Sequence, residues 1–252
     1  MTAFSHPRVV ASIEARMGST RLPGKVLMSI QGKPAIQRLV DRLRMCLSVD
    51  DIVVATTTNA NDDPLEKWCS DYGVACFRGS EKDVLNRVVE AHRYMRSDIV
   101  VEITGDCPLT DPHIVDLGVE TFLFHSVDIV SNCGTSLTWP MGQYVQVFPL
   151  RLLDEVDRQV DDVVVHEHVS LYFYEHPERY KIIELFSLIQ WREPQWRMQL
   201  DYSEDLHFLN EVYSRLEPLH GEGFGIEEVV ALLRREPQLL DINRHCQEKS
   251  TR

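Results

Sequence analysis

Two similar stretches of sequence, DIVVATT at Asp51–Thr57 and DIVVEIT at Asp98–Thr104, decide the fold class. Each is a continuous run of mostly β-branched residues, which is typical of a strand buried on both faces of a parallel sheet. RVVASIE at Arg8–Glu14 has the same character. Segments with an apolar stripe at helical spacing separate these runs. The alternation predicts an α/β fold, a three-layer αβα sandwich with a mainly parallel sheet.

The same pattern predicts the other elements of this half of the chain. We expect further strands at Val74–Phe77 and Val127–Ser131, and helices from Pro34, over Pro64–Tyr72, over Asp83–Met95 and from Asp111-Pro112. Ligands bind at the carboxyl ends of the strands in open α/β sheets. The loops that follow the strands are therefore the first place to look for a site.

The pattern loosens after about residue 132. Here we expect strands at Gln143–Phe148, Tyr180–Ser187 and Gln195–Asp201, and helices over Leu150–Val160, His168–His176, Ser203–Leu216 and Gly225–Arg235. We find no internal repeat and no convincing linker. The prediction is a single domain over residues 1–252, with 132–195 as an insertion.

Composition and charge exclude several classes of protein. The 252 residues are 44% apolar, which argues against a disordered chain, and the net charge of −13 argues against a nucleic-acid-binding surface. No apolar run approaches the roughly 20 residues that span a bilayer, and no secretory signal is evident. The six cysteines include no CxxC pair. We interpret them as reduced thiols of a cytoplasmic protein that does not act at a membrane.

Positive charge is concentrated near the N-terminus. Residues 8–44 contain eight Lys or Arg but only Glu14 and Asp41. The loop Ala15–Lys25 (ARMGSTRLPGK) lies in this segment and combines two glycines, small hydroxyls and three cations. Backbone N–H groups in such a loop can bind an anion. Neither a Walker A motif nor GxGxxG is present, so the loop predicts a phosphate site of another kind.

Two aspartates from distant parts of the chain complete the expected site. Asp106 follows the strand that ends at Thr104, and Asp201 is expected at the end of a late strand. Together they predict a Mg²⁺ site facing the basic loop. Without a cation, we expect the two carboxylates to repel each other. Glu204 and Asp205 favour the first turn of the next helix, which Ser203 is expected to cap, and need no further role.

Four motifs carry a family resemblance. Glu14–Leu27 (EARMGSTRLPGKVL), Phe77–Leu85 (FRGSEKDVL), Ile103–Pro112 (ITGDCPLTDP) and Leu200–Leu206 (LDYSEDL) resemble, in this order, the cytidylyltransferases of the spore-coat polysaccharide (SpsF-like) group. The first motif is also similar to that of CMP-KDO synthetases. The resemblance implies a nucleotidyltransferase-type sheet of the GT-A/Rossmann-like kind. It also implies a Mg²⁺-dependent transfer of CMP from CTP to an acceptor, usually a sugar.

The resemblance also implies roles for individual residues. Lys25, Arg16 and Asp106 would be catalytic, and Asp106 and Asp201 would bind the metal. The nucleotide would contact two groups of residues: Ala15, Arg16, Met17, Gly18, Ser19, Arg21 and Lys25 in the loop, and Gly79, Ser80, Asp83, Val84, Arg87, Thr104 and Gly105 beside it. Which side chains read cytosine is left open.

Several positions depart from the family pattern. Glu14 stands where Gln or Pro is common, Tyr144 and Gln146 stand where two carboxylates are common, and His166 replaces an arginine. The last three fall in the region expected to bind the acceptor, so the acceptor's identity stays open. His166 and His168 are also weak candidates for zinc, since a third ligand is not evident.

The sequence favours a CTP-dependent cytidylyltransferase whose acceptor is an acidic or modified sugar of surface polysaccharide biosynthesis. A phosphonate or phosphorylated small molecule is an alternative acceptor. A GT-A glycosyltransferase would share the sheet but normally shows a DxD-like pair, and Gly105-Asp106-Cys107 is not one. A non-catalytic CTP-binding scaffold is the remaining alternative. The aromatic-rich middle of the chain, together with the resemblance, predicts a homodimer.

Overall fold

One seven-stranded sheet organises the protein. The computed structural model describes residues 6–134 and 136–247. The sheet order is β5 (Ala75–Gly79), β4 (Asp51–Thr57), β1 (Val9–Glu14), β6 (Ile99–Thr104), β8 (Gln146–Pro149), β7 (Ile129–Ser131) and β9 (Ile182–Glu184). Neighbouring strands pair in parallel except at β8, which is antiparallel to both β6 and β7. The predicted mainly parallel sheet is confirmed.

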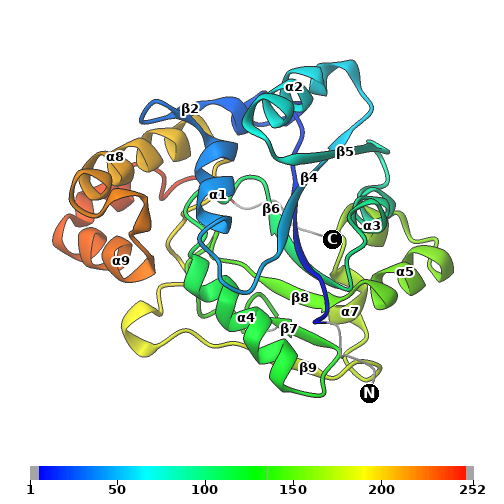
Figure 1. Cartoon of the computed structure of the whole chain (residues 1–252). Helices are drawn as coiled ribbons and strands as arrows, with labels where there is room; N and C mark the ends of the chain where they lie inside the picture. Colours follow the sequence, from blue (N-terminus) through cyan, green and yellow to red (C-terminus); the bar gives the residue numbers. More distant parts are fainter. Residues whose placement is uncertain (1–5, 135, 248–252) are drawn as a thin grey trace.

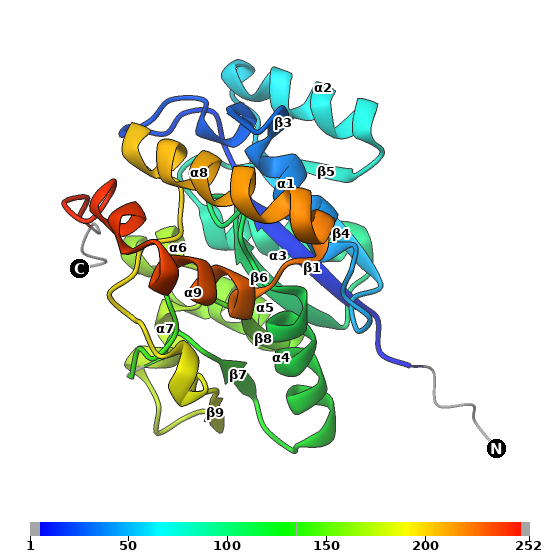
Figure 2. The same cartoon turned by 90° about the vertical axis from the view of Figure 1, so that its left-hand side faces the viewer.

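Helices cover both faces of this sheet, as Figures 1 and 2 show. One layer contains α1 (Ala35–Leu43), α2 (Asp63–Tyr72), α4 (Pro112–Phe124), α8 (Ser203–His220) and α9 (Ile226–Arg235). The other contains α3 (Val84–Met95), α5 (Leu150–Gln159), α6 (Val163–Glu167) and α7 (Leu171–Glu175). The three-layer αβα architecture is therefore as predicted. Among the described residues, no helix combines the length and apolar character needed to cross a bilayer.

Short elements connect these layers. A two-stranded ribbon pairs β2 (Ser29–Ile30) with β3 (Lys33–Pro34). Five 3-10 turns lie at η1 (Lys25–Leu27), η2 (Ala60–Asp62), η3 (Ile189–Trp191), η4 (Gly221–Gly223) and η5 (Pro237–Asp241). The turn η1 follows the basic loop directly, so Lys25 is fixed at its first position.

The central strand β1 shows why the sequence adopts three layers. Val9, Ala11 and Ile13 point into the core on the α1 side, and Val10 points into the core on the α3 side. A strand that is apolar on both faces is stable only between two helix layers. Ser12 and Glu14 share the face of Val10 because side chains alternate along a strand. These two polar residues therefore approach the site from the α3 side.

One predicted element is wrong, and another is shorter than expected. Gln195–Asp201 is not a strand and forms one isolated bridge, between Met141 and Arg197. The Leu200 N–H instead donates to the Asp106 carbonyl at 2.7 Å. The helix expected over His168–His176 is shorter, α7 over Leu171–Glu175, because His168 adopts extended backbone angles between it and the preceding α6.

Residues 132–195 complete the sheet rather than lying outside it. They contribute β8, which is inserted between β6 and β7, and the edge strand β9. They also supply α5, α6 and α7, which cover the same face as α3.

Candidate active site

A cavity of about 640 Å³ opens at the carboxyl ends of β1 and β6. It brings together most of the residues predicted for the site: Ala15, Arg16, Ser19, Arg21, Lys25, Val84, Arg87, Thr104, Gly105, Asp106 and Asp201. Gly105 is required at its position, because a Cβ there would come within 2.7 Å of the Glu14 carbonyl oxygen. The close approach of β1 and β6 thus depends on this glycine.

Lys25 joins the two predicted metal ligands. Its Nζ lies 2.8 Å from Asp106 Oδ2 and 2.8 Å from Asp201 Oδ1. Burial opposes the charge of the ammonium, but the two carboxylates outweigh this effect and raise the pKa of Lys25. Burial likewise opposes ionisation of Asp106, and Lys25 outweighs it, so the pKa of Asp106 is lowered. The prediction that the two aspartates repel each other in the absence of a metal is therefore wrong, because the ammonium of Lys25 lies between them.

Asp201 is the most firmly held of these groups. Its side chain is 1% exposed, and its Oδ1 also forms an ion pair with Arg21 Nη2 at 2.8 Å. Arg197 Nη2 and Gln199 Nε2 donate to its Oδ2 at 2.7 and 3.0 Å. A buried carboxylate needs such partners, since an unpaired buried charge is strongly unfavourable. The surrounding donors fix the orientation of Asp201 toward Lys25.

Asp205 supports this arrangement from behind, a role that its place in a helical first turn did not predict. Its Oδ2 accepts the backbone N–H groups of Asp201 and Tyr202 at 2.9 and 3.0 Å. Its Oδ1 accepts from Arg197 Nε at 3.0 Å. Tyr202, not Ser203, occupies the N-cap position of α8. Asp205, in the first turn of α8, therefore both caps the helix and immobilises Asp201.

The basic loop is held at its two ends. The Gly24 N–H donates to the Met17 carbonyl at 2.9 Å, and Gly24 has a φ of 73°, which favours glycine. The Met17 N–H donates to Asp62 Oδ1 at 2.6 Å, and Asp62 is buried. Between these anchors Ser19, Thr20 and Arg21 face the cavity. Arg16 is half-exposed and lies 3.9 Å from Glu81, which leaves its guanidinium accessible to a ligand.

Five predicted nucleotide-binding residues do not line the cavity: Met17, Gly18, Gly79, Ser80 and Asp83. Three of them position a residue that does. A Cβ on Gly79 would lie 2.9 Å from Arg87 Cγ, so this glycine allows Arg87 to pack closely. The Ser80 carbonyl accepts from Arg87 Nη1 at 2.6 Å, and Asp83 caps α3 by accepting the Asn86 N–H.

Glu14 and Arg87 form the side of the cavity nearest α3. Burial raises the pKa of Glu14 to about 7, an effect that Arg87 opposes and Asp106 reinforces. Burial also lowers the pKa of Arg87. Glu102 lies on the same sheet face as Glu14, and burial together with the Glu14 charge raises its pKa well above the usual range. The sequence showed Glu14 only as a departure from the family pattern.

Other cavity residues were not predicted either. They are Thr20, Val26, Glu167, His168, Tyr202 and Gln247. Glu167 and His168 come from the end of α6, in the region where the acceptor is expected. Gln146 lies beside Glu102 in the β6–β8 pair, and the Tyr174 hydroxyl donates to its Oε1. Glu167, His168 and Gln247 lie outside the sequence motifs and reach the cavity only through tertiary contacts, whereas Thr20, Val26 and Tyr202 lie within the motifs.

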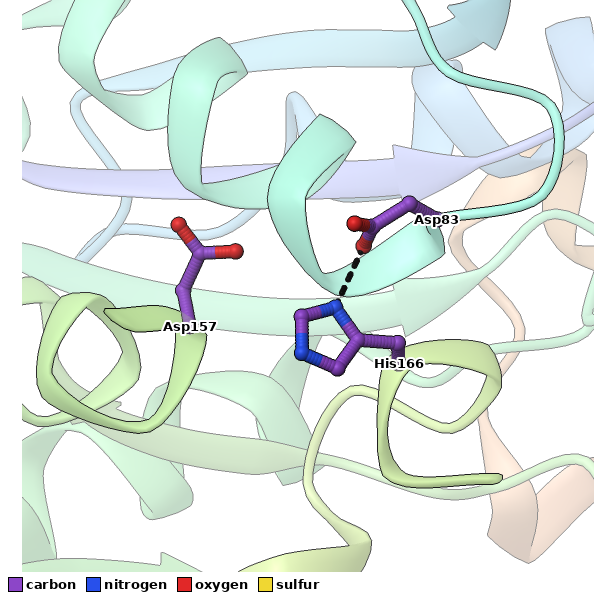
Figure 3. Close-up of side chains that lie close together, drawn as sticks. All are labelled: Asp83, Asp157 and His166. Carbon is purple, nitrogen blue, oxygen red and sulfur yellow. Dashed lines mark hydrogen bonds and ion pairs between the residues drawn. The ribbon is translucent and has the colours of Figure 1, made fainter. Parts of the chain in front are cut away.

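Asp83, Asp157 and His166 form a three-residue group with metal-ligand chemistry, shown in Figure 3. His166 Nδ1 lies 2.8 Å from Asp83 Oδ1, and Nε2 lies 2.6 Å from the Val160 carbonyl oxygen. A carbonyl oxygen can only accept, so Nε2 carries a proton, and Nδ1 faces a carboxylate. Burial opposes protonation, but Asp83 and the Val160 carbonyl outweigh it and raise the pKa of His166. The geometry fits an imidazolium that joins α6 to α3 better than a zinc ligand.

A mainly parallel sheet carries a basic loop after its first strand, with a lysine between two aspartates, as expected for a nucleotidyltransferase. The chain belongs to the cytidylyltransferase family, whose model matches residues 10–228. The resemblance inferred from the four motifs is thereby confirmed, and the protein is an enzyme of the nucleotidyltransferase class.

Individual relatives support this assignment over nearly the whole chain. The spore coat polysaccharide biosynthesis protein SpsF of Bacillus subtilis is 34% identical over 232 residues, which cover 89% of this chain and 93% of that protein. A cytidylyltransferase structure from Leptospira borgpetersenii superposes with a TM-score of 0.88 at 30% identity, covering 97% of this chain and 100% of that one. A CMP:2-keto-3-deoxy-manno-octonic acid synthetase complexed with CTP shares the fold, with a TM-score of 0.62 at 18% identity over 82% of this chain and 99% of that one.

Proposed function

We propose that the protein transfers CMP from CTP to a small-molecule acceptor and releases pyrophosphate. The observation that carries the proposal is that Lys25, at the end of the basic loop, contacts both Asp106 and Asp201. An acceptor oxygen would attack the α-phosphorus, and the bond to the β-phosphate would break. Such transfers depend on positioning and on stabilisation of charge more than on covalent catalysis.

The basic residues have distinct tasks in this proposal. Lys25 lies between two carboxylates, and it can move from them to a phosphate oxygen because the phosphate then provides the negative charge that pairs with it. Arg16 and Arg21 would bind the remaining phosphate oxygens, and Ser19 would add a hydroxyl donor. Charge-assisted hydrogen bonds of this kind contribute about 1.5–3 kcal/mol each. Lys25 and Arg16 would therefore stabilise the leaving pyrophosphate.

The donor set fits a hard divalent cation. Asp106 Oδ2 and Asp201 Oδ1 both contact the position that the ammonium of Lys25 occupies. Carboxylate oxygens are the protein ligands that Mg²⁺ prefers. Asp106 and Asp201 would bind the metal once Lys25 contacts the phosphates. A bound Mg²⁺ would neutralise phosphate charge and orient the α-phosphate.

For the acceptor we propose an acidic or modified sugar of surface polysaccharide biosynthesis. The relatives support this class: one is named for spore coat polysaccharide biosynthesis, and a maize relative, 39% identical over 52% of this chain, is named 3-deoxy-manno-octulosonate cytidylyltransferase. Glu167 and His168 line the part of the cavity where such an acceptor would bind. A phosphonate or phosphorylated small molecule is the second candidate class. We further propose that the enzyme is a cytoplasmic homodimer.

A pyrophosphate-release assay with CTP, Mg²⁺ and a panel of acceptors tests the function. The panel contains 2-keto-3-deoxy sugar acids, sugar 1-phosphates and alkylphosphonates, and each active mixture is checked for the CMP-linked product. Lys25→Met should abolish the signal, and Lys67→Met, on the exposed face of α2, should not. CTP binding without turnover for any acceptor would favour a scaffold, and transfer of sugar from a nucleotide sugar would favour a glycosyltransferase.

A further inference from the structure

The cavity is lined by two chemically different groups of residues. In one group Lys25 and Arg21 are paired with Asp106 and Asp201, which suits phosphates. The other group, Glu14, Val84 and Arg87, forms the wall nearest α3. Val84 is the first residue of α3 and offers an apolar surface beside two polar side chains. This combination suits a flat heterocycle with hydrogen-bonding groups on one edge.

Glu14 and Arg87 each have a buried atom that lacks a partner. Within the described residues, neither Glu14 Oε1 nor Arg87 Nε makes a hydrogen bond. Arg87 is 3% exposed. The charge of Glu14 attracts it, but among the described residues the two side chains do not form an ion pair. Buried polar atoms are normally satisfied, so an unsatisfied pair in a ligand cavity indicates groups that the ligand satisfies.

The Arg87 side chain and the Glu14 backbone are also held in place. Arg87 packs against Gly79 and donates from Nη1 to the Ser80 carbonyl, a contact that does not use Nε. Glu14 ends the central strand β1, with Ala55 on one side and Thr104 on the other. Rigid donors and acceptors discriminate between ligands better than mobile ones, because they cannot rotate to suit the wrong one.

We propose that Glu14 and Arg87 read the base of the nucleotide. Glu14 accepts a hydrogen bond from the 4-amino group of cytosine, and Arg87 Nε donates to its O2. Uracil carries an acceptor oxygen at position 4, which would face the Glu14 carboxylate, whereas it shares O2 with cytosine. Glu14 therefore selects between the two pyrimidines, and Arg87 binds both. The inference rests on the proposed use of CTP and assigns the residues that make this choice.

Calorimetric titration of the full-length protein with nucleoside triphosphates tests the inference without any acceptor. The probes are CTP, UTP and the 4-deamino analogue of CTP, which has hydrogen at position 4. At pH 8.5, where Glu14 is ionised, the wild type should bind CTP at least ~10-fold more tightly than either analogue. Glu14→Gln should reduce the preference for CTP over UTP about tenfold, because an amide both donates and accepts.

Matched variants separate this role from a general one. Glu90→Gln makes the same chemical change on the exposed side of α3 and should leave the preference unchanged. Arg87→Lys should weaken CTP and UTP equally. An unchanged preference in Glu14→Gln, or equal wild-type affinity for CTP and the 4-deamino analogue, would overturn the assignment. The analogue series uses the wild type alone, so it decides the question even if a variant fails to fold. A wild type that binds no nucleoside triphosphate would contradict the proposed function itself.

Discussion

Lys25 Nζ lies 2.8 Å from Asp201 Oδ1, although 176 positions separate the two residues in the sequence. The contact joins the basic loop after β1 to the segment that precedes α8. Asp201 is also held by Arg197 and Gln199, whereas among the described residues the ammonium of Lys25 is held by Asp106 and Asp201 alone. We infer that phosphate binding moves Lys25 and leaves Asp201 in place.

The first prediction concerns Lys25. Lys25→Met should weaken CTP binding by ~10-fold or more, because a charge-assisted hydrogen bond to phosphate is lost. Arg16→Ala should have an effect of the same kind. Lys25→Met should also lower the melting temperature of the ligand-free protein, since Asp106 and Asp201 lose their shared cation. Calorimetry and thermal melting measure both effects, with Lys67→Met as the control. Unchanged CTP affinity in both variants would show that the basic loop does not bind the phosphates.

The second prediction concerns Asp106. The pKa of Asp106 is lowered in the folded protein, so its charge adds stability at pH values above the unfolded pKa and loses it as the pH falls through the folded value. Asp106→Asn should therefore lower the melting temperature at pH 7, and the difference should shrink toward pH 3. Mg²⁺-dependent pyrophosphate release should fall by orders of magnitude. A ligand-free variant that melts higher than the wild type at pH 7 would mean that Lys25 does not neutralise the two aspartates.

The third prediction concerns the contact between His166 and Asp83. The pKa of His166 is raised, so protonation stabilises the fold below the ordinary pKa of histidine, and this stability is lost as the pH rises through the raised value. The loss of melting temperature in His166→Gln should be large near pH 6 and small near pH 9. Asp157 adds to the effect and should be tested alongside Asp83. His207→Gln, on the exposed side of α8, is the control. Stabilisation by Zn²⁺ that depends on His166 would instead identify a metal site.

The fourth prediction concerns the homodimer. Phe186, Leu188 and Ile189 are 54%, 51% and 83% exposed, and they lie at 186–189 in the segment after β9, where buried Ser187 separates the first two. Exposed apolar side chains grouped in this way are typical of an interface. Light scattering should give twice the chain mass of 29.1 kDa at micromolar concentration, and Ile189→Asp should shift it toward the monomer. A monomeric wild type would contradict this prediction.

The strands of the parallel half could be predicted because burial on both faces leaves a direct trace in the sequence. Asp51–Thr57 is one such run, and its bounds agree with β4. In Gln195–Asp201 Met198 and Leu200 alternate with polar residues, but Arg197, Gln199 and Asp201 are buried too, and the backbone pairs with a loop instead of a strand. The local pattern therefore reports neither the burial of these polar side chains nor the backbone partners of the segment.

The candidate site divides in the same way. The ARMGSTRLPGK loop and Asp106 are local motifs and were found directly. Asp62 supports Met17 from 45 positions away, and Asp205 supports Asp201 through Arg197. Each looks like an ordinary helix-initiating acid in the sequence, so its role depends on contacts that only the folded chain creates.

The last prediction joins the stability of the ligand-free protein to the choice of base. The folded-state pKa of Glu14 is about 7, above its ordinary value, so ionising this carboxyl lowers the stability of the fold as the pH rises from about 4.5 through 7. Glu14→Gln removes that cost, so the variant should melt higher than the wild type at pH 8 and close to it at pH 4. The same variant should lose preference for CTP over UTP. Thermal melting across this pH range, with Glu90→Gln as the control, measures the first effect. A Glu14→Gln protein that is less stable at pH 8 would show that the carboxylate already has a partner in the ligand-free fold, and another acceptor would then be needed to read the 4-amino group of cytosine.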